Sequence, residues 1–220
     1  MPFRDRTDAG RRLASRLAHY RASNAVVLGL PRGGVPVAYV VATALQLPLD
    51  IVVVRKLGVP WHQELGMGAV AEGGVRWVDQ SIVTAIGATS AQVDAIAARE
   101  LTEVDRRVAR WRGGHAPLSL TGKTAIVVDD GVATGGTMRA ALLAVRARGP
   151  AQVVLAVPVA EASTLKELAD AADVVVCDEP VRALFSIGAW YRDFRQVSDD
   201  KVTELLALAR ATAGEQDVAP

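Results

Sequence analysis

The chain has 220 residues, of which 50% are hydrophobic and 22% are charged, and its formal net charge is +1. This length suits one α/β domain with a well-filled core, or a domain with a small appendage. A net charge so close to zero gives no electrostatic reason to expect binding to nucleic acid or to an anionic membrane. No apolar run reaches the roughly 20 residues of a membrane-spanning helix, and the first residues lack the apolar core of a signal peptide. We therefore expect a cytoplasmic protein.

The periodicity of apolar residues predicts helices that alternate with short strands. Helices are expected over residues 8–20, 35–45, 90–111, 161–172 and 199–211, and strands at 25–30, 49–54, 125–128, 153–157 and 174–177. Strand–helix–strand alternation with short turns is typical of an α/β fold, with a central, mostly parallel sheet flanked by helices. In such sheets ligands bind beyond the carboxyl ends of the strands.

Residues 57–74 interrupt this alternation with five glycines and a proline. Parts of the stretch, at 68–72 and 75–78, could form a hairpin that turns through Gly73 and Gly74. An ordinary surface hairpin and a mobile lid over a site both fit this composition.

The helix expected over 90–111 carries many charges, and Thr89 or Ser90 can cap its N-terminus. It could cover one face of a site or contact a partner subunit. A solvated helix packed on its own domain is the simpler interpretation.

The only cysteine, Cys177, ends the apolar run 174–177. A buried structural thiol is the favoured interpretation, and a nucleophile is not. One cysteine cannot form a disulfide within the chain.

The most informative stretch is 125–137. A buried strand is followed by two adjacent carboxylates, Asp129 and Asp130, and then by a turn rich in glycine and threonine that leads into a helix beginning near Gly135. Such a turn offers free backbone N–H groups and the positive end of the helix dipole, which bind phosphate. The carboxylates can accept hydrogen bonds from sugar hydroxyls or hold Mg²⁺ through water. An ordinary acidic strand end would explain either half of the pattern alone.

The order Val-Val-Asp-Asp-x-x-Ala-Thr-Gly-Gly-Thr-Met, beginning at Val127, resembles the phosphoribosyl pyrophosphate (PRPP) motif of type I phosphoribosyltransferases, and most closely its adenine phosphoribosyltransferase form. The two common phosphate loops, with Gly-Lys-Ser/Thr or Gly-x-Gly-x-x-Gly, are not found here. The resemblance implies transfer of a ribose 5-phosphate group from PRPP to a nitrogenous base or related acceptor, with release of pyrophosphate and with Mg²⁺ as cofactor. It places the protein in nucleotide salvage.

The same resemblance implies one domain over residues 1–220. Within it we expect a flexible lid at about 57–78, an inserted helix at about 90–112 and a hood at about 178–197. PRPP and a small-molecule acceptor would be the partners, and a homodimer is compatible with the family.

Roles follow for the motif by resemblance. Asp129 and Asp130 would be catalytic residues that bind the ribose hydroxyls and help to order Mg²⁺ through water. The ribose 5-phosphate would lie in the turn made by Gly131, Val132, Ala133, Thr134, Gly135, Gly136 and Thr137.

Arg32 and Gly33 resemble the pyrophosphate loop that follows the first core strand of the family. This loop often contains a strained or cis peptide, which we expect at Pro31–Arg32 or Arg32–Gly33. Arg55 and Lys56 resemble the Arg-Lys pair that ends the next strand in adenine and orotate members of the family, and they would neutralise pyrophosphate or reach the lid. Arg32 and Lys56 would contribute to catalysis as well as to binding. A solvated turn and a solvated strand end are the plainer alternatives.

Glu72 lies where adenine enzymes carry a lid glutamate, which makes it an acid–base candidate. Phe185, Trp190 and Tyr191 lie in a segment that faintly resembles the base-covering region of the hypoxanthine/guanine enzymes, and they could stack on a flat acceptor. A hydrophobic hood or a dimer contact would explain the same aromatics.

Two departures bear on the acceptor. Ala133 stands where 6-oxopurine enzymes carry an aspartate that handles the purine N7 proton, which argues against that chemistry. Residues 59–61, Val-Pro-Trp, replace the Lys-Leu-Pro of the adenine enzymes. The acceptor is therefore left open.

Two other functions remain. A PRPP-binding sensor would keep the site without turnover, although no helix-turn-helix or basic patch is visible. A generic α/β nucleotide binder or phosphatase is the weaker alternative, because no nucleophile lies beside the phosphate turn.

Overall fold

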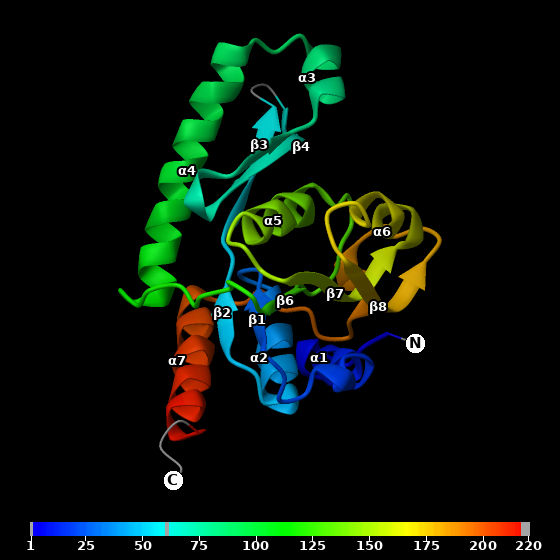
Figure 1. Cartoon of the computed structure of the whole chain (residues 1–220). Helices are drawn as coiled ribbons and strands as arrows, with labels where there is room; N and C mark the ends of the chain where they lie inside the picture. The colour runs from blue at the N-terminus through cyan, green and yellow to red at the C-terminus, as the bar shows by residue number, and fades with distance from the viewer. Residues whose placement is uncertain (1, 60–61, 217–220) are drawn as a thin grey trace.

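A computed structural model describes residues 2–59 and 62–216, except for the side chains of 62–65 and 213–216 (Figure 1). The principal elements are α1 (Arg6–Arg16), β1 (Ala25–Gly29), α2 (Gly34–Leu45), β2 (Leu49–Ile51), β3 (Val54–Val59), β4 (His62–Ala71), β5 (Arg76–Val78), α3 (Gln80–Ile86), α4 (Ser90–Arg112), β6 (Thr124–Val128), α5 (Gly136–Arg146), β7 (Gln152–Glu161), α6 (Ala162–Leu168), β8 (Val174–Val181) and α7 (Asp199–Gln216).

The central sheet has five parallel strands in the order β2-β1-β6-β7-β8. Helices α1, α2 and α7 lie on one side of this sheet, and α5 and α6 lie on the other (Figure 1). The predicted α/β class, a mostly parallel sheet flanked by helices, is confirmed. Strands β1 and β6 pair with Gly29 opposite Val128, so the two strands end at the same level.

Alternate side chains of each central strand enter different halves of the core. Val27 and Ile126 join the apolar cluster beneath α1, α2 and α7, whereas Val26 and Val127 join the cluster beneath α5 and α6. All four are fully buried. Burial on both faces explains why these strands read as unbroken apolar runs in the sequence.

The strand predicted at 49–54 is wrong in its extent. Its first part is β2, which ends at Ile51, and the chain then crosses into a second, antiparallel sheet of order β3-β4-β5. Val53 already belongs to the crossing, because its carbonyl accepts the backbone N–H of Glu72 at 3.0 Å. Arg55 and Lys56 therefore lie within β3 and not at the end of a central strand.

The segment interpreted as a lid forms this second sheet. The predicted hairpin is present, with Gly68 of β4 opposite Val78 of β5. Leu57, Met67 and Val70 are fully buried, since the stem of the sheet packs against α4 and α5. The tip at Pro60 and Trp61 lies outside the described residues. The described part of the segment expected as a lid is therefore held in place by this packing.

Helix α4 confirms the helix predicted over 90–111. Thr89 caps it, and Gln92 completes a capping box with Thr89. Val104 and Trp111 are buried where α4 packs on the second sheet and α7. A large part of the helix therefore belongs to the core, in addition to its solvated charges.

Other predicted boundaries shift. The helix expected over 8–20 begins at Arg6 and ends at Arg16, and the helix expected over 161–172 is the shorter α6. Helix α3 was not predicted from the sequence, because seven residues give too few turns for a clear apolar period. Across 2–59 and 62–216, none of the helices combines the length and the apolarity needed to cross a membrane.

Candidate functional site

Two loops meet at the carboxyl ends of β1 and β6. The loop after β1 contains a cis peptide between Pro31 and Arg32, one of the two positions expected from the sequence. A Cβ on Gly33 would overlap the Asp130 carboxylate, and one on Gly34 would lie 2.8 Å from Oδ1 of Asp129. These glycines are therefore needed for the loop to lie directly against both carboxylates.

The two carboxylates are held close to each other in a region with little solvent. Oδ1 of Asp129 accepts the backbone N–H of Asp130 at 2.8 Å, and only 7% of Asp130 is exposed. Burial raises the pKa of Asp129 well above its ordinary value, and the charge of Asp130 raises it further. Burial also raises the pKa of Asp130, against the opposing charge of Arg6. Ionising both carboxylates at this place therefore costs free energy in the folded protein.

Arg6, the first residue of α1, was not singled out from the sequence. Its Nε and Nη2 each lie 2.8 Å from Oδ2 of Asp130. The contact joins residues 124 positions apart, and no local pattern in the sequence marks it. A charged residue near the start of a helix is ordinary on the surface, so only the fold identifies this one.

The turn after Asp130 divides into a buried and an open half. Val132 is buried, and its N–H donates to the carbonyl of Val159 at 3.0 Å. Val132 was predicted to bind PRPP, but its backbone N–H already donates to β7 and is not available to a ligand. Ala133, Thr134 and Thr137 are exposed.

Gly135 lies at φ +77°, in the left-handed region, at the start of α5. A Cβ there would come within 2.8 Å of Thr164 Cγ2. Because the first N–H groups of a helix lack intrahelical partners, this end of α5 offers the donors that a phosphate needs.

One cavity adjoins the motif, and a second adjoins Arg6. One, of about 350 Å³, is lined by Thr134, Gly135 and Gly136 and by Trp77 of β5. The other, of about 470 Å³, lies next to Arg6 and is lined also by Lys201 of α7 and by residues of the hood. The sequence did not identify Trp77, which reaches the motif because the second sheet packs over α5.

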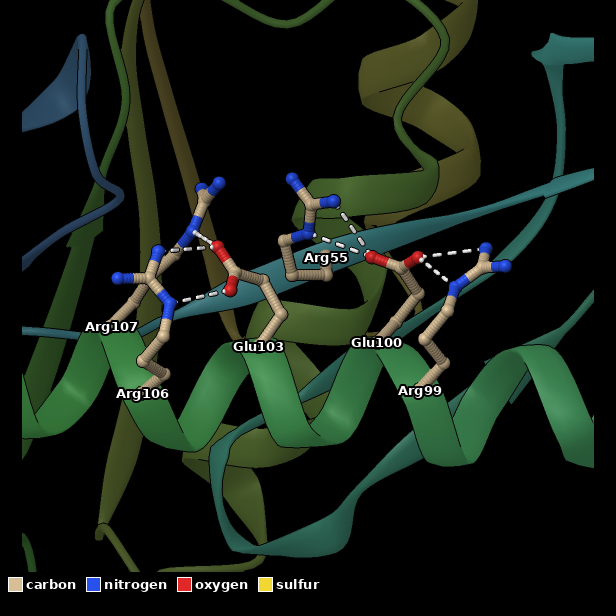
Figure 2. A network of polar contacts seen from close by, with 6 residues as sticks. All are labelled: Arg55, Arg99, Glu100, Glu103, Arg106 and Arg107. Carbon is tan, nitrogen blue, oxygen red and sulfur yellow. Dashed lines mark hydrogen bonds and ion pairs between the residues drawn. The ribbon is translucent and has the colours of Figure 1, made fainter.

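The basic residues predicted to bind pyrophosphate have other neighbours in this structure. Arg32 is half-buried, and its Nη1 lies 3.7 Å from Asp199 at the start of α7. Arg55 donates from Nε and Nη2 to Oε2 of Glu100, at 2.9 and 2.7 Å (Figure 2). Lys56 is exposed, and its aliphatic stem lies beside Gly66. Of these three basic residues, only Arg32 belongs to the loop that lies against the motif.

Figure 2 shows why Arg55 faces α4. Glu100 is flanked by Arg55 and Arg99, while Glu103, one turn further along the helix, pairs with Arg106 and Arg107. Hydrogen bonds from those two arginines lower the pKa of Glu103 to about 2. The row of paired charges fixes Arg55 on the α4 side of β3.

Glu72, the acid–base candidate, belongs to a buried ionic cluster. Its Oε2 lies 3.0 Å from Arg112, and its Oε1 lies 3.2 Å from Arg148. Arg112 also pairs with Asp50 of β2 at 3.0 Å. Both carboxylate oxygens of Glu72 are thus engaged in joining the second sheet to α4, to the turn after α5 and, through Arg112, to the central sheet.

The three aromatics predicted to stack on an acceptor lie in different surroundings. Tyr191 is only 6% exposed and is placed between the rings of Phe3 and Phe194. Its hydroxyl donates to the backbone carbonyl of Asp130 at 2.6 Å, so Tyr191 supports the motif and presents no ring face to an acceptor. Trp190 is half-buried, and Phe185 is fully exposed.

Cys177 lies in β8, and burial raises the pKa of its thiol to about 11. The thiolate is the reactive form, so we expect iodoacetamide to label the folded protein slowly at pH 8 and the urea-unfolded protein much faster. Mass spectrometry over a labelling time course measures both rates. Equal rates in the two states would mean that the thiol is accessible and ionised in the fold.

Within the described ranges, no three histidine, cysteine, aspartate or glutamate residues gather into a metal cluster. Asp129 and Asp130 are hard oxygen ligands, which suits Mg²⁺ bound largely by water and by substrate oxygens. The donor set fits the expected ion in that form and does not build an all-protein cage.

The family model for the phosphoribosyl transferase domain matches residues 4–190. The chain belongs to the phosphoribosyl transferase domain family. This type I phosphoribosyltransferase domain is 48% identical over 220 residues to the "Putative phosphoribosyl transferase" of Mycobacterium tuberculosis, in strains CDC 1551 and H37Rv. The match covers 99% of this chain and 50% of each relative. The chain thus spans about half the length of these curated relatives.

A solved structure is also similar over nearly the whole domain. The crystal structure of the protein TT1426 from Thermus thermophilus has 41% sequence identity and a TM-score of 0.80, and the alignment covers 94% of this chain and 98% of that one. Both the main sheet and the second sheet therefore belong to an arrangement that a natural relative shares.

Proposed function

We propose that this phosphoribosyltransferase domain transfers the 5-phosphoribosyl group of PRPP to a nitrogenous base or related acceptor and releases pyrophosphate. The observation that carries the proposal is the close approach of the 31–34 loop to Asp129 and Asp130. It joins a loop suited to pyrophosphate, a sugar-binding carboxylate pair and a phosphate turn in one place. A cytoplasmic role in nucleotide salvage is the setting that we propose for it.

The proposed binding mode divides PRPP between the two loops. The 5-phosphate accepts hydrogen bonds from the turn at Thr134–Thr137 and lies at the positive end of α5. The ribose hydroxyls donate to Asp129 and Asp130. Pyrophosphate lies against Arg32 and the backbone of Gly33.

In the reaction, the bond between ribose C1 and the pyrophosphate oxygen breaks, and a bond from C1 to the acceptor nitrogen forms. Positive charge develops on the ribose ring as pyrophosphate leaves with the electron pair. The buried carboxylates stabilise that charge, and the packed loops keep water from C1. Mg²⁺, held at Asp129 and Asp130, would offset charge on the pyrophosphate oxygens.

Ala133 is the residue that restricts the choice of acceptor. Ala133 is exposed at the mouth of the turn and has no group that could handle a purine N7 proton. We therefore propose an acceptor other than a 6-oxopurine. Phe185 and Trp190 remain the aromatic candidates for contact with a flat acceptor, since Tyr191 is enclosed.

A PRPP sensor without turnover is the second candidate. The observation that favours it is the engagement of Arg55 and Glu72, which pair with Glu100 and with two arginines. With Arg55 and Glu72 held in these ion pairs, the site could bind PRPP without accelerating its cleavage.

The test is pyrophosphate release from PRPP and Mg²⁺ in the presence of a panel of bases and amines, with PRPP binding measured separately by calorimetry. We expect release with at least one acceptor that is not hypoxanthine or guanine. Tight binding of PRPP without release for any acceptor would favour the sensor. If the wild-type protein binds no PRPP at all, the proposed function is wrong.

A further inference from the structure

We infer that Arg6 is a positioning residue of the donor site, which orients the Asp130 carboxylate for the ribose hydroxyls. The inference rests on the proposed function, because it names a further residue of the same site. It begins from the pair of 2.8 Å contacts that Arg6 makes to Oδ2 of Asp130.

The guanidinium of Arg6 is fixed on three sides. Besides the two contacts to Asp130, Nη1 donates to the backbone carbonyl of Arg195 at 2.9 Å. The guanidinium carbon lies 4.0 Å from the centre of the Phe194 ring. Only 12% of the Arg6 side chain is exposed. A planar fork held in this way presents its donors in one direction.

Asp130 is correspondingly fixed from both its side chain and its backbone. Arg6 donates to Oδ2, and Gly33 packs against the same carboxylate. The Tyr191 hydroxyl donates to the backbone carbonyl of Asp130. Because Arg6 holds Oδ2, this contact sets the orientation of the whole Asp130 carboxylate, and so the direction in which it accepts from a ribose hydroxyl. The orientation of Asp130 thus depends on α1 and on the hood.

The segment that carries Arg6 is itself held to the hood. The backbone N–H of Phe3 donates to the carbonyl of Trp190 at 2.7 Å, and that of Arg192 donates back to the carbonyl of Phe3 at 2.9 Å. Asp5 caps α1 through the N–H of Asp8 at 2.8 Å, which sets where the helix, and so Arg6, begins. These contacts give Arg6 a defined place that solvent-exposed arginines lack.

A positioning role differs from direct binding of pyrophosphate, although Arg6 also borders the 470 Å³ cavity. If Arg6 acts through Asp130, its loss lowers the affinity for ligands that carry ribose hydroxyls and leaves the affinity for a ligand without them unchanged. If Arg6 itself binds the leaving group, its loss weakens pyrophosphate as well.

The experiment measures the affinities of PRPP, ribose 5-phosphate and inorganic pyrophosphate, each with Mg²⁺, by calorimetry on the wild-type chain, Arg6→Ala and Arg6→Lys. Arg11→Ala is the matched control, since Arg11 lies on the same helix and is exposed. We expect Arg6→Ala to weaken the binding of PRPP and of ribose 5-phosphate by about tenfold or more, because one charge-assisted contact is lost. Arg6→Lys keeps the charge but cannot form the planar fork, so it should recover only a small part of that loss. Arg11→Ala should match the wild type.

The inference is overturned if Arg6→Ala binds all three ligands as the wild type does, or if pyrophosphate weakens as much as ribose 5-phosphate does. Because Arg6→Ala could lower stability, the more conservative Arg6→Lys serves as the second test. If Arg6→Lys binds ribose 5-phosphate as tightly as the wild type does, the positive charge alone is sufficient. That result would overturn the positioning role. Absence of PRPP binding by the wild type would instead refute the proposed function.

Discussion

Replacement of Asp129 by Asn is expected to weaken PRPP binding by roughly 10- to 100-fold, because it removes an ionised acceptor for the ribose hydroxyls. The same change should leave the thermal stability of the ligand-free protein equal or higher. Asp129 is costly to ionise beside the Asp130 carboxylate in a partly buried position, and the amide carries no such cost. Calorimetry gives the affinity, and thermal unfolding with and without PRPP gives the stability and the ligand-induced shift.

The dependence on pH follows from the direction of the pKa shift. The pKa of Asp129 is raised in the folded state above its ordinary value of 3.8, so between these two pKa values the native protein holds a proton that the unfolded chain has released. The stability of the wild type should therefore fall as pH rises above about 4, relative to Asp129→Asn. Urea unfolding of both proteins at pH 5 and pH 8 measures this difference.

Asp94→Asn is the matched control. Asp94 is exposed on α4 and pairs with Arg76, so its replacement should change neither the PRPP affinity nor the pH dependence. A loss of stability in Asp129→Asn, with PRPP affinity unchanged, would contradict both the assignment of the site and the electrostatic argument.

The second large effect is expected at Arg112. This side chain is 5% exposed and pairs with Asp50 and Glu72, whose side chains are nearly as buried. Arg112→Met leaves both carboxylates without their shared cation, and such a loss typically costs about 3–5 kcal/mol of the free energy of unfolding. Urea unfolding followed by circular dichroism measures the change.

Arg110→Met supplies the comparison on the same helix. Arg110 pairs with Asp199 but is about half exposed, so its removal should cost no more than about 1 kcal/mol. Equal losses in the two variants would show that the buried cluster is not a special source of stability.

The same cluster allows a direct test of Glu72. If its role is the structural one seen here, Glu72→Gln lowers the free energy of unfolding, and PRPP affinity changes little. A variant with normal stability and a specific loss of turnover would restore the acid–base role.

The sequence was sufficient for the fold class and the central motif because both depend on local patterns. Strands buried on both faces appear as apolar runs, and a carboxylate pair before Thr-Gly-Gly-Thr specifies its own strand, turn and helix. The expected cis peptide also lies within such a pattern, between Pro31 and Arg32. These features need few contacts from distant parts of the chain.

What sequence reasoning missed depends on contacts between distant segments. The crossing from β2 to β3 separates Arg55 from the central strand ends, yet residues 49–54, apolar except for Asp50, have the pattern of one strand. Glu72 has a suitable local motif, but Arg112 and Arg148 approach it from elements 40 and 76 residues away. Arg6 and Tyr191 acquire their roles in the same way, through the fold alone.

The pairing of residues near Phe3 with residues near Tyr191 also has a consequence for biosynthesis. Because a ribosome releases a chain from its N-terminal side, the segment at Phe3 that leads into α1 cannot pair with Trp190 and Arg192 until those residues have been synthesised. Until then Arg6 lacks the carbonyl of Arg195 and the ring of Phe194, and Asp130 lacks the hydroxyl of Tyr191. The donor site is therefore completed only after the central sheet that carries it has been synthesised.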